Sequence, residues 1–262
     1  MEAVVAADLA ATLSTGTLTV FAPTNAAFAA LLTELGVSKE ALLANKPLLT
    51  AVLTYHVLGS TVARADVPLG KAITPVSGGF FKIESNNGLK ITDGRNRVST
   101  ITATDIQASN GVVHLVDRVL LPADKDIVAT ASALPDFSIL VEAVVAAGLA
   151  STLQGTGPFT VFAPTNAAFA ALLAELGVSK ADLLANTALL TKVLTYHVVP
   201  ARVLKAEVPV NTAITTVQGQ SFTVNSSLVI TDQNMRTSSI VATDVFTSNG
   251  VIHVVDKVIL PK

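Results

Sequence analysis

The chain contains a long segment of its own sequence twice. Thr19–Lys46 matches Thr160–Thr187 at 24 of 28 positions, with an offset of 141 residues. Two further pairs of segments match in the same order, Thr54–Val57 with Thr195–Val198 and Ser109–His114 with Ser248–His253. Solenoid repeats have periods of about 20 to 50 residues, so a unit of this length is a whole domain. The duplication therefore predicts two domains that share one fold.

The repeats place domain 1 at residues 1–122 and domain 2 at residues 123–262, with a short linker at residues 123–126. Glu142 corresponds to Glu2, but the segment ahead of Glu142 has no counterpart in the first copy. We therefore expect domain 1 to lack its N-terminal helix and to leave apolar surface uncovered. We also expect the natural gene to encode more sequence upstream.

Helical patterns precede strand patterns within each copy. Apolar residues recur every three to four positions in Glu2–Leu13 and in Phe137–Leu153, which predicts helices. Thr24 and Thr165 each follow a short β-type run and are predicted to cap the next helix. The period changes to two in residues 71–121, which predicts strands joined by turns. Helices first and sheet second indicate the α+β class.

Two local signals refine this prediction. The offset falls from 141 to 139 where Glu84–Gly88 corresponds to the shorter Asn225–Ser227, between strand-like runs. A length difference of this kind is typical of a hairpin tip. Ser179 and Asp182 have the spacing of a capping box, which predicts a helix that begins there in the second copy.

Composition narrows the classes of partner. Only 14% of the residues are charged and the formal net charge is -2, so no basic excess is present to neutralise nucleic-acid phosphates. No run approaches the roughly 18 apolar residues that a transmembrane helix needs, so we expect no transmembrane segment. The residues after Met1 lack a secretory-signal pattern, and we expect any export signal to lie outside these residues.

Motifs of enzyme and metal sites are missing from the sequence. It has no G-x-S-x-G elbow, no phosphate-binding loop, no H-E-x-x-H and no cysteine. The four histidines fall in two pairs, His56 with His114 and His197 with His253, whose separations of 58 and 56 residues do not resemble zinc-ligand spacing. We therefore expect no enzyme activity, no metal and no cofactor. Imidazoles hydrogen-bonded to backbone in the core are the favoured interpretation.

Three motifs resemble the fasciclin domain family, and each occurs in both copies. In the first copy they are Thr19–Phe28 (TVFAPTNAAF), the pair Tyr55–His56, and Asn110–Asp117 (NGVVHLVD). The resemblance implies two fasciclin-like domains, each an antiparallel β-wedge packed with a bundle of short α-helices. It also implies an extracellular or surface protein associated with adhesion and matrix assembly. The alanine-rich, cysteine-free composition resembles that of a bacterial member.

Most motif residues have a structural interpretation. Phe21 lies in a short apolar strand and Phe28 on the helix that follows, so both rings are predicted to share one core. Thr24 lies at the strand-to-helix turn as a cap, and Asn110-Gly111 has turn chemistry ahead of a strand. The residues expected to be structural are Phe21, Pro23, Thr24, Asn25, Phe28, Asn110, Gly111 and His114 and, in the second copy, Phe162, Pro164, Thr165, Asn166, Phe169, Asn249, Gly250 and His253.

The resemblance makes the two Tyr-His pairs candidate recognition residues, because this pair is linked to adhesion in animal matrix members of the family. The candidates are Tyr55 and His56 in the first copy and Tyr196 and His197 in the second. A purely structural role stays open beside this one. Adhesion that falls only in proportion to lost folding in Tyr196→Phe or His197→Ala would favour the structural role.

A second candidate pair precedes the Asn-Gly motif. Animal matrix members carry an Asp-Ile pair there that is linked to integrin binding, and this chain has Asp105-Ile106 and Asp244-Val245. The residues just before each pair do not match those of the animal motifs. The alternative is an aspartate that accepts hydrogen bonds from backbone amides at a strand end.

These observations favour a non-enzymatic adhesion or matrix-binding protein that is secreted, periplasmic or attached to the cell surface. The expected partner is a cell-surface or matrix protein or a polysaccharide. Two similar surfaces on one chain would add avidity to weak single contacts. The alternative is a carrier of a small apolar ligand in a pocket between helices and β-wedge, which requires a pocket of several hundred cubic ångströms.

Overall fold

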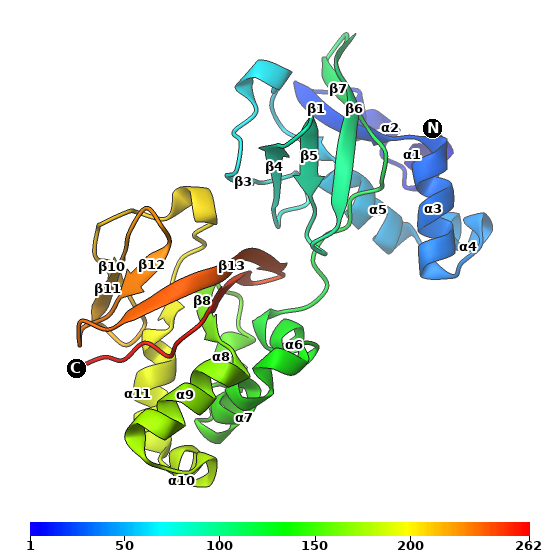
Figure 1. The fold of residues 1–262 in the computed structure, drawn as a ribbon. Coiled ribbons are helices and arrows are strands. Elements are labelled where there is room, and N and C mark those ends of the chain that lie inside the picture. The colour runs from blue at the N-terminus through cyan, green and yellow to red at the C-terminus, as the bar shows by residue number, and fades with distance from the viewer. The chain divides into compact units, whose positions relative to one another are not determined.

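The computed structural model describes residues 1–262 as two compact units, Met1–Ala123 and Asp124–Lys262, here called unit 1 and unit 2. In Figure 1, unit 1 runs from blue to blue-green and unit 2 from green to red. Each unit has a group of short helices and one seven-stranded sheet. The expected α+β class is confirmed for both units.

Unit 1 begins with its helices, which include one short 3-10 helix after β2. They are α1 (Glu2–Ala6), α2 (Ala10–Leu13), α3 (Asn25–Leu35), α4 (Lys39–Ala44), α5 (Lys46–Tyr55) and η1 (Arg64–Asp66). Thr24 caps α3 as predicted, because its Oγ1 accepts a hydrogen bond from Ala27 N at 3.2 Å. Gly36 ends α3 with φ 65°, a left-handed conformation that glycine adopts without strain.

The single helix expected over Glu2–Leu13 is wrong in one respect, because the structure breaks it into α1 and α2. Asp8 has φ 58°, and no α-helix continues through a left-handed residue. The helix expected over Phe137–Leu153 is broken in the same way at Gly148, which has φ 67°. Apolar spacing continued across both breaks, so periodicity did not reveal them.

The sheet of unit 1 has the order β2-β1-β7-β6-β5-β4-β3. Its strands are β1 (Leu18–Pro23), β2 (Val57–Leu58), β3 (Ala72–Ile73), β4 (Phe81–Ser85), β5 (Leu89–Thr92), β6 (Val98–Ala108) and β7 (Gly111–Val116). All neighbours are antiparallel except β1 and β7, which are parallel and pair Phe21 with His114. The antiparallel wedge implied by the resemblance therefore contains one parallel pair.

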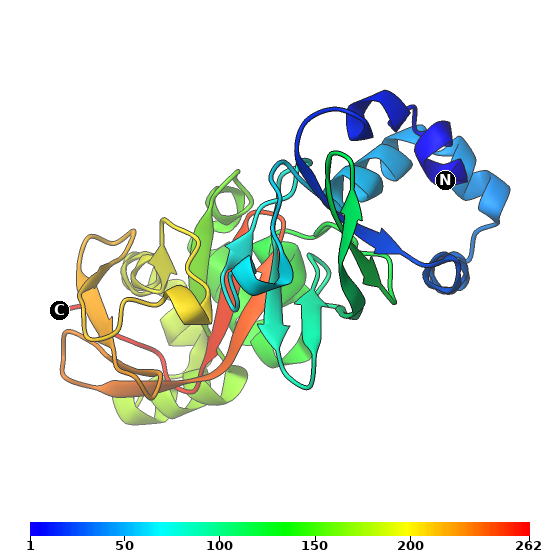
Figure 2. The ribbon, with the colours of Figure 1, turned by 90° about the horizontal axis from the view of Figure 1, so that it is seen from above.

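The sheet curls until its two ends approach each other, as the view in Figure 2 also lets the reader follow. The edge strands β2 and β3 are only two residues long. Val76, just after β3, donates its backbone N–H to Val57 O of β2 at 2.8 Å. In unit 2 the matching bond joins Val217 N to Val198 O at 2.7 Å.

Unit 2 repeats this plan and adds one segment ahead of it. The added elements are α6 (Ile127–Ser132) and the 3-10 helix η2 (Pro135–Phe137). Then follow α7 (Ser138–Ala146), α8 (Ala150–Leu153), α9 (Asn166–Leu176), α10 (Lys180–Ala185), α11 (Thr187–Tyr196) and η3 (Lys205–Glu207). The capping box at the start of α10 is confirmed, since Ser179 and Asp182 bond reciprocally.

The sheet of unit 2 has the order β10-β11-β12-β13-β14-β8-β9. Its strands are β8 (Phe159–Pro164), β9 (Val198–Val199), β10 (Ile214–Thr215), β11 (Ser221–Val224), β12 (Val229–Thr231), β13 (Thr237–Thr247) and β14 (Gly250–Val255). Strands β8 and β14 form the parallel pair. The predicted hairpin tip is confirmed, because Asn225–Ser227 lies between β11 and β12.

Each unit has two buried apolar clusters. In unit 1 one cluster lies among the helices around Leu31, Leu49 and Val119. The other contains Phe21 and Phe81 of the sheet, whose ring centroids lie 5.4 Å apart in an edge-to-face arrangement. Unit 2 divides its core in the same way. No helix in the structure combines the length and the hydropathy that crossing a membrane requires.

Candidate functional site

The candidates Asp105 and Ile106 lie on a β-bulge inside β6. The register of β6 on β7 shifts between Ala103 and Ile106, and Asp105 has φ 58°, a left-handed conformation that aspartate tolerates better than most residues. A bulge bends its strand and turns side chains in new directions. Ile106 is 42% exposed. The pair therefore lies in mid-strand at the surface, whereas the sequence suggested a strand end.

The second copy has the same bulge in β13. Asp244 has φ 61°, and the register of β13 on β14 shifts between Ala242 and Val245. Asp244 is buried, with 6% exposure, and Val245 is half-buried. The two bulges thus share a backbone, but unit 1 exposes its pair more.

In unit 1 the aspartate and a histidine of the bulge region bind the loop that follows β2. Asp105 Oδ1 accepts from Arg64 N at 2.9 Å. Asp105 N donates to His114 Nδ1 at 3.2 Å, so the imidazole carries its proton on Nε2 and donates it to Val62 O at 2.9 Å. His114 therefore links the bulge to the loop and is 1% exposed.

The first strand holds the same loop from the other side. Thr19 Oγ1 donates to Ser60 O at 2.7 Å and accepts from Val62 N at 2.8 Å. Unit 2 repeats this network with Thr160 on Ala201 and Val203, His253 on Val203 O and Asp244 on Lys205 N. One loop and one bulge are therefore fixed together in each unit by motif side chains.

The tyrosines of the Tyr-His pairs lie in the sheet core. Tyr55 and Tyr196 are 0% exposed. Tyr55 donates its hydroxyl to Phe80 O, and Tyr196 donates to Ser221 O at 2.9 Å. Burial raises the pKa of both hydroxyls, that of Tyr196 to about 12, so both are neutral donors at physiological pH. Each hydroxyl secures the chain at the start of β4 or β11.

The histidines of these pairs are also buried and bond to backbone at both ring nitrogens. His56 Nδ1 lies 2.7 Å from Val52 O, and its Nε2 accepts from Leu120 N at 2.9 Å. His197 repeats this with Val193 O at 2.8 Å and Ile259 N at 3.1 Å. Burial lowers the pKa of both imidazoles to about 4, so both are neutral at pH 7.

The candidate recognition residues therefore separate into two places. The bulge pair Asp105-Ile106 reaches the surface, while Tyr55 and His56 are enclosed in the core. A partner can touch the bulge without any change in the fold. It can contact the Tyr-His pair only if the domain opens.

Replacing Tyr196 by phenylalanine removes one buried hydrogen bond without opening a cavity. Ser221 O keeps a second donor, Gln233 Nε2, at 2.5 Å. We expect the free energy of unfolding of unit 2 to fall by about 1 kcal/mol. Urea unfolding followed by far-UV circular dichroism measures this change. A fall above about 3 kcal/mol would contradict the assignment of a single replaceable hydrogen bond.

The phenylalanines of the motifs lie at different depths in the two units. Phe21 and Phe162 are each 1% exposed and pack against sheet residues. Phe169 is also 1% exposed, whereas Phe28 is only partly buried. Pro23 and Pro164 end the strands β1 and β8. Thr165 caps α9 through Ala168 N at 3.2 Å.

The glycine of each Asn-Gly motif allows a close approach of two strands. A Cβ atom on Gly111 would lie 1.9 Å from Leu18 O, and one on Gly250 would lie 2.0 Å from Phe159 O. Both glycines begin the last strand of their sheet, beside the parallel partner strand. The motif is therefore required by the start of the parallel pair.

One polar cluster was missed by the sequence reasoning. Asp93 is 1% exposed and accepts hydrogen bonds from Arg95 N, Arg97 N and Leu121 N. The guanidinium of Arg97 binds Asp93 Oδ2 at 2.7 Å and Glu34 at 2.9 Å. The available signal was an Asp-x-x-x-Arg spacing that recurs as Asp232 and Arg236.

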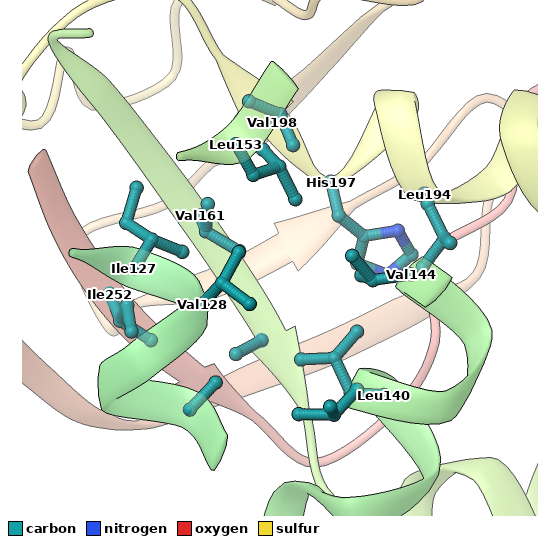
Figure 3. Close-up of a pocket in the computed structure, with 13 residues that line it drawn as sticks. Ile127, Val128, Leu140, Val144, Leu153, Val161, Leu194, His197, Val198 and Ile252 are labelled. Atoms are coloured by element: carbon teal, nitrogen blue, oxygen red, sulfur yellow. The ribbon is translucent and has the colours of Figure 1, made fainter. Parts of the chain in front are cut away.

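The described residues include no group of three or more His, Cys, Asp or Glu side chains placed to hold a metal ion. Unit 2 has an apolar cavity between α6, α7, β8 and α11, into which His197 and Leu140 point (Figure 3). Its free space is about 30 Å³. Pockets for drug-sized ligands measure about 300 to 1,000 Å³, so this cavity is too small for a carried ligand.

Residues 1–122 and 135–261 both match the family model of the fasciclin domain. The chain is 44% identical over 150 residues to Protein sll1483 of Synechocystis sp., covering 56% of this chain and 79% of that protein. It is 29% identical over 255 residues to the transforming growth factor-beta-induced protein ig-h3 of Sus scrofa, covering 94% of this chain but only 35% of that protein.

The fold is similar to a solved FAS1 domain pair from the insect cell adhesion molecule fasciclin I. The TM-score is 0.51 at 18% identity, and the match covers 99% of this chain and 95% of that chain. The curled sheet with its bundle of short helices is therefore a known architecture, seen there also as a tandem pair.

Proposed function

Because the chain belongs to the fasciclin family, we propose that it is a non-enzymatic adhesion or matrix-binding protein. Its partner is a cell-surface or matrix protein or a polysaccharide. One observation carries the proposal: in each unit the polar motif residues hold a single bulge and the adjoining loop. In unit 1 this bulge presents Ile106 and Asp105 to solvent.

The bulge acts as the contact surface, and the Tyr-His pairs act on it indirectly by holding the fold. Supporting this division, all four histidines bond at both ring nitrogens, which leaves no free imidazole nitrogen for catalysis or ligation. Ile106 is more exposed than Val245. We therefore assign the larger contribution to unit 1 and an added avidity to unit 2.

We place the protein outside the cytoplasm, either secreted, periplasmic or attached to the cell surface. Support comes from the similarity to an insect cell adhesion molecule and to the immunogenic protein MPB70 of Mycobacterium bovis, which is 35% identical over 115 residues, 44% of this chain and 55% of that protein. The cavity in unit 2 does not favour the alternative of an apolar-ligand carrier.

The test measures binding of the fluorescently labelled full chain to plates coated with matrix extract and with purified matrix polysaccharides. We expect Ile106→Ser to weaken binding about tenfold and the double variant Ile106→Ser, Val245→Ser to weaken it further. Val98→Ser is the matched control, because Val98 is 52% exposed on the same strand, away from the bulge.

Binding by the double variant that equals that of the unaltered chain would overturn the proposal. Few charged residues surround a short-range apolar contact of this kind, so binding is expected to change little between low and moderate salt. A collapse of binding over that range would indicate an electrostatic surface elsewhere.

A further inference from the structure

The segment that unit 2 has in addition, residues 127–139, covers a surface whose equivalent is uncovered in unit 1. Within the described residues this segment occurs once, ahead of α7, and unit 1 begins with α1, the counterpart of α7. Helix α6 packs on β14, α7 and α8, and η2 packs on α9. The footprint of the segment on unit 2 can therefore be compared residue by residue with unit 1.

Two asparagines hold the backbone of this segment. Asn166 accepts from Ile139 N at 3.0 Å and donates to Pro135 O at 3.0 Å. Asn249 Oδ1 accepts from Ile127 N, the first residue of α6, at 3.0 Å. The asparagines therefore grip the segment at both ends.

The matching asparagines of unit 1 are present without those bonds. Asn25 corresponds to Asn166, is exposed, and makes no side-chain hydrogen bond. Asn110 corresponds to Asn249 and donates Nδ2 to Leu13 O at 2.9 Å, which leaves its Oδ1 without a donor. Donor and acceptor groups for a peptide backbone are thus already in place.

Apolar side chains show the same difference. In unit 2 the segment and its surroundings leave Val161, Ala163 and Ile252 at most 5% exposed. Their counterparts in unit 1, which are Val20, Ala22 and Val113, are only partly buried. The sheet face under α6 therefore has an apolar but uncovered equivalent.

A groove continues this surface along α3 and α4. It has a volume of about 510 Å³ and is lined by Pro23, Asn25, Phe28 and Leu32, among others. In unit 2 the ring of Phe137 is 4% exposed and belongs to the same cluster as Phe169, the counterpart of Phe28. The groove therefore lies where unit 2 seats its own Pro-Asp-Phe turn.

The walls of the groove are preformed. An ion pair joins Glu2 and Lys39 beside the groove, and the equivalent pair, Glu142 with Lys180, is also formed in unit 2, where the segment is seated. Ala27 and Ala168 are each 1% exposed, so the inner side of the helix is packed alike in both units. Binding to a preformed groove requires little reordering of the protein.

We propose that this face of unit 1 binds a peptide segment of another polypeptide chain, of the type represented by residues 127–139. Such a segment has a short apolar helix, a proline turn and an aromatic residue in that order. The aromatic ring fills the groove against Phe28, Asn25 binds the backbone after the proline, and Asn110 Oδ1 accepts the first N–H of the helix.

The test uses the full chain and a labelled synthetic peptide of residues 126–140, with binding followed by fluorescence anisotropy. We expect saturable binding of one peptide per chain. Ala29→Arg places a long side chain in the groove from an exposed helix position and is expected to raise the Kd at least about tenfold. A peptide with Phe137→Ala should bind with a similar loss.

The matched control is Ala170→Arg, at the equivalent exposed position of α9 in unit 2, where the chain's own segment already occupies the groove. It should leave the Kd unchanged. Asn25→Ala provides a second variant that cannot fail by misfolding, since the Asn25 side chain makes no hydrogen bond.

Three results would overturn the proposal. The first is the absence of saturable binding, and the second is an equal loss in Ala29→Arg and Ala170→Arg. The third is a dimer in light scattering that Ala29→Arg dissociates, because the groove then serves a second copy of this chain.

Discussion

Replacing Asp93 by alanine is expected to lower the free energy of unfolding of unit 1 by about 3 to 5 kcal/mol. The variant leaves three backbone N–H groups without their acceptor and removes the buried partner of Arg97. Arg97 is 13% exposed and also donates to Val119 O at 2.6 Å, so its charge cannot turn freely to water. The cost is that of an uncompensated buried charge.

The equivalent aspartate of unit 2 provides the comparison. Asp232 also accepts three backbone N–H groups, but Arg236 bonds to Glu175 at the surface. Asp232→Ala is therefore expected to cost only about 1 to 3 kcal/mol. Equal losses in the two variants would show that the arginine adds nothing to the buried cluster of unit 1.

Each unit contains one of the two tyrosines, and the chain has no tryptophan. In a Tyr196→Phe background, the near-UV circular dichroism of Tyr55 therefore reports the unfolding of unit 1 alone. A Tyr55→Phe background reports unit 2 through Tyr196. Urea titrations with these two probes assign each change in stability to its unit.

Acid is expected to destabilise both units between about pH 6.5 and pH 4. His56 and His197 have their pKa lowered to about 4 by burial, whereas an unfolded histidine titrates near 6.5. The unfolded state therefore binds more protons in this window, and stability is full above pH 6.5 and falls as the pH drops towards 4. Each histidine should remove about 2 kcal/mol by pH 5 and about 3 kcal/mol by pH 4.

The control for the acid effect is a glutamine at each histidine, because its side-chain oxygen accepts the N–H of Leu120 or Ile259 and does not titrate. The variants His56→Gln and His197→Gln have a lower stability at pH 7 but lose the steep part of the pH dependence in their own unit. A pH profile unchanged in both variants would assign the acid effect to carboxylates.

The parts of the fold that depend on nearby residues were predictable from the sequence. The caps at Thr24, Thr165 and Ser179 and the hairpin tip at Asn225–Ser227 depend on a few neighbouring groups, and all of them are confirmed. The strand Leu89–Thr92 also lies where alternation placed it. Local hydrogen bonding and side-chain alternation leave signals that a single sequence carries.

The parts that depend on distant residues were not predictable. The parallel pairing of β1 with β7 joins residues far apart in the chain, and no short pattern encodes it. The bonds from Asp93 to Leu121 and from His56 to Leu120 are of the same kind. At Asp8 a left-handed residue breaks a helix without glycine or proline to announce it. The candidate site shares this difficulty, since its bulge and loop meet only in the folded unit.

The two-residue edge strands bear on how such chains behave when many of them are crowded on one surface. A long free edge offers a row of unpaired N–H and C=O groups, from which fibrils of identical chains can grow. In this fold the outer strands are too short to extend a ladder, and the bond from Val76 N to Val57 O engages one of them within its own sheet. Dense display, which avidity requires, is thereby separated from edge-to-edge aggregation.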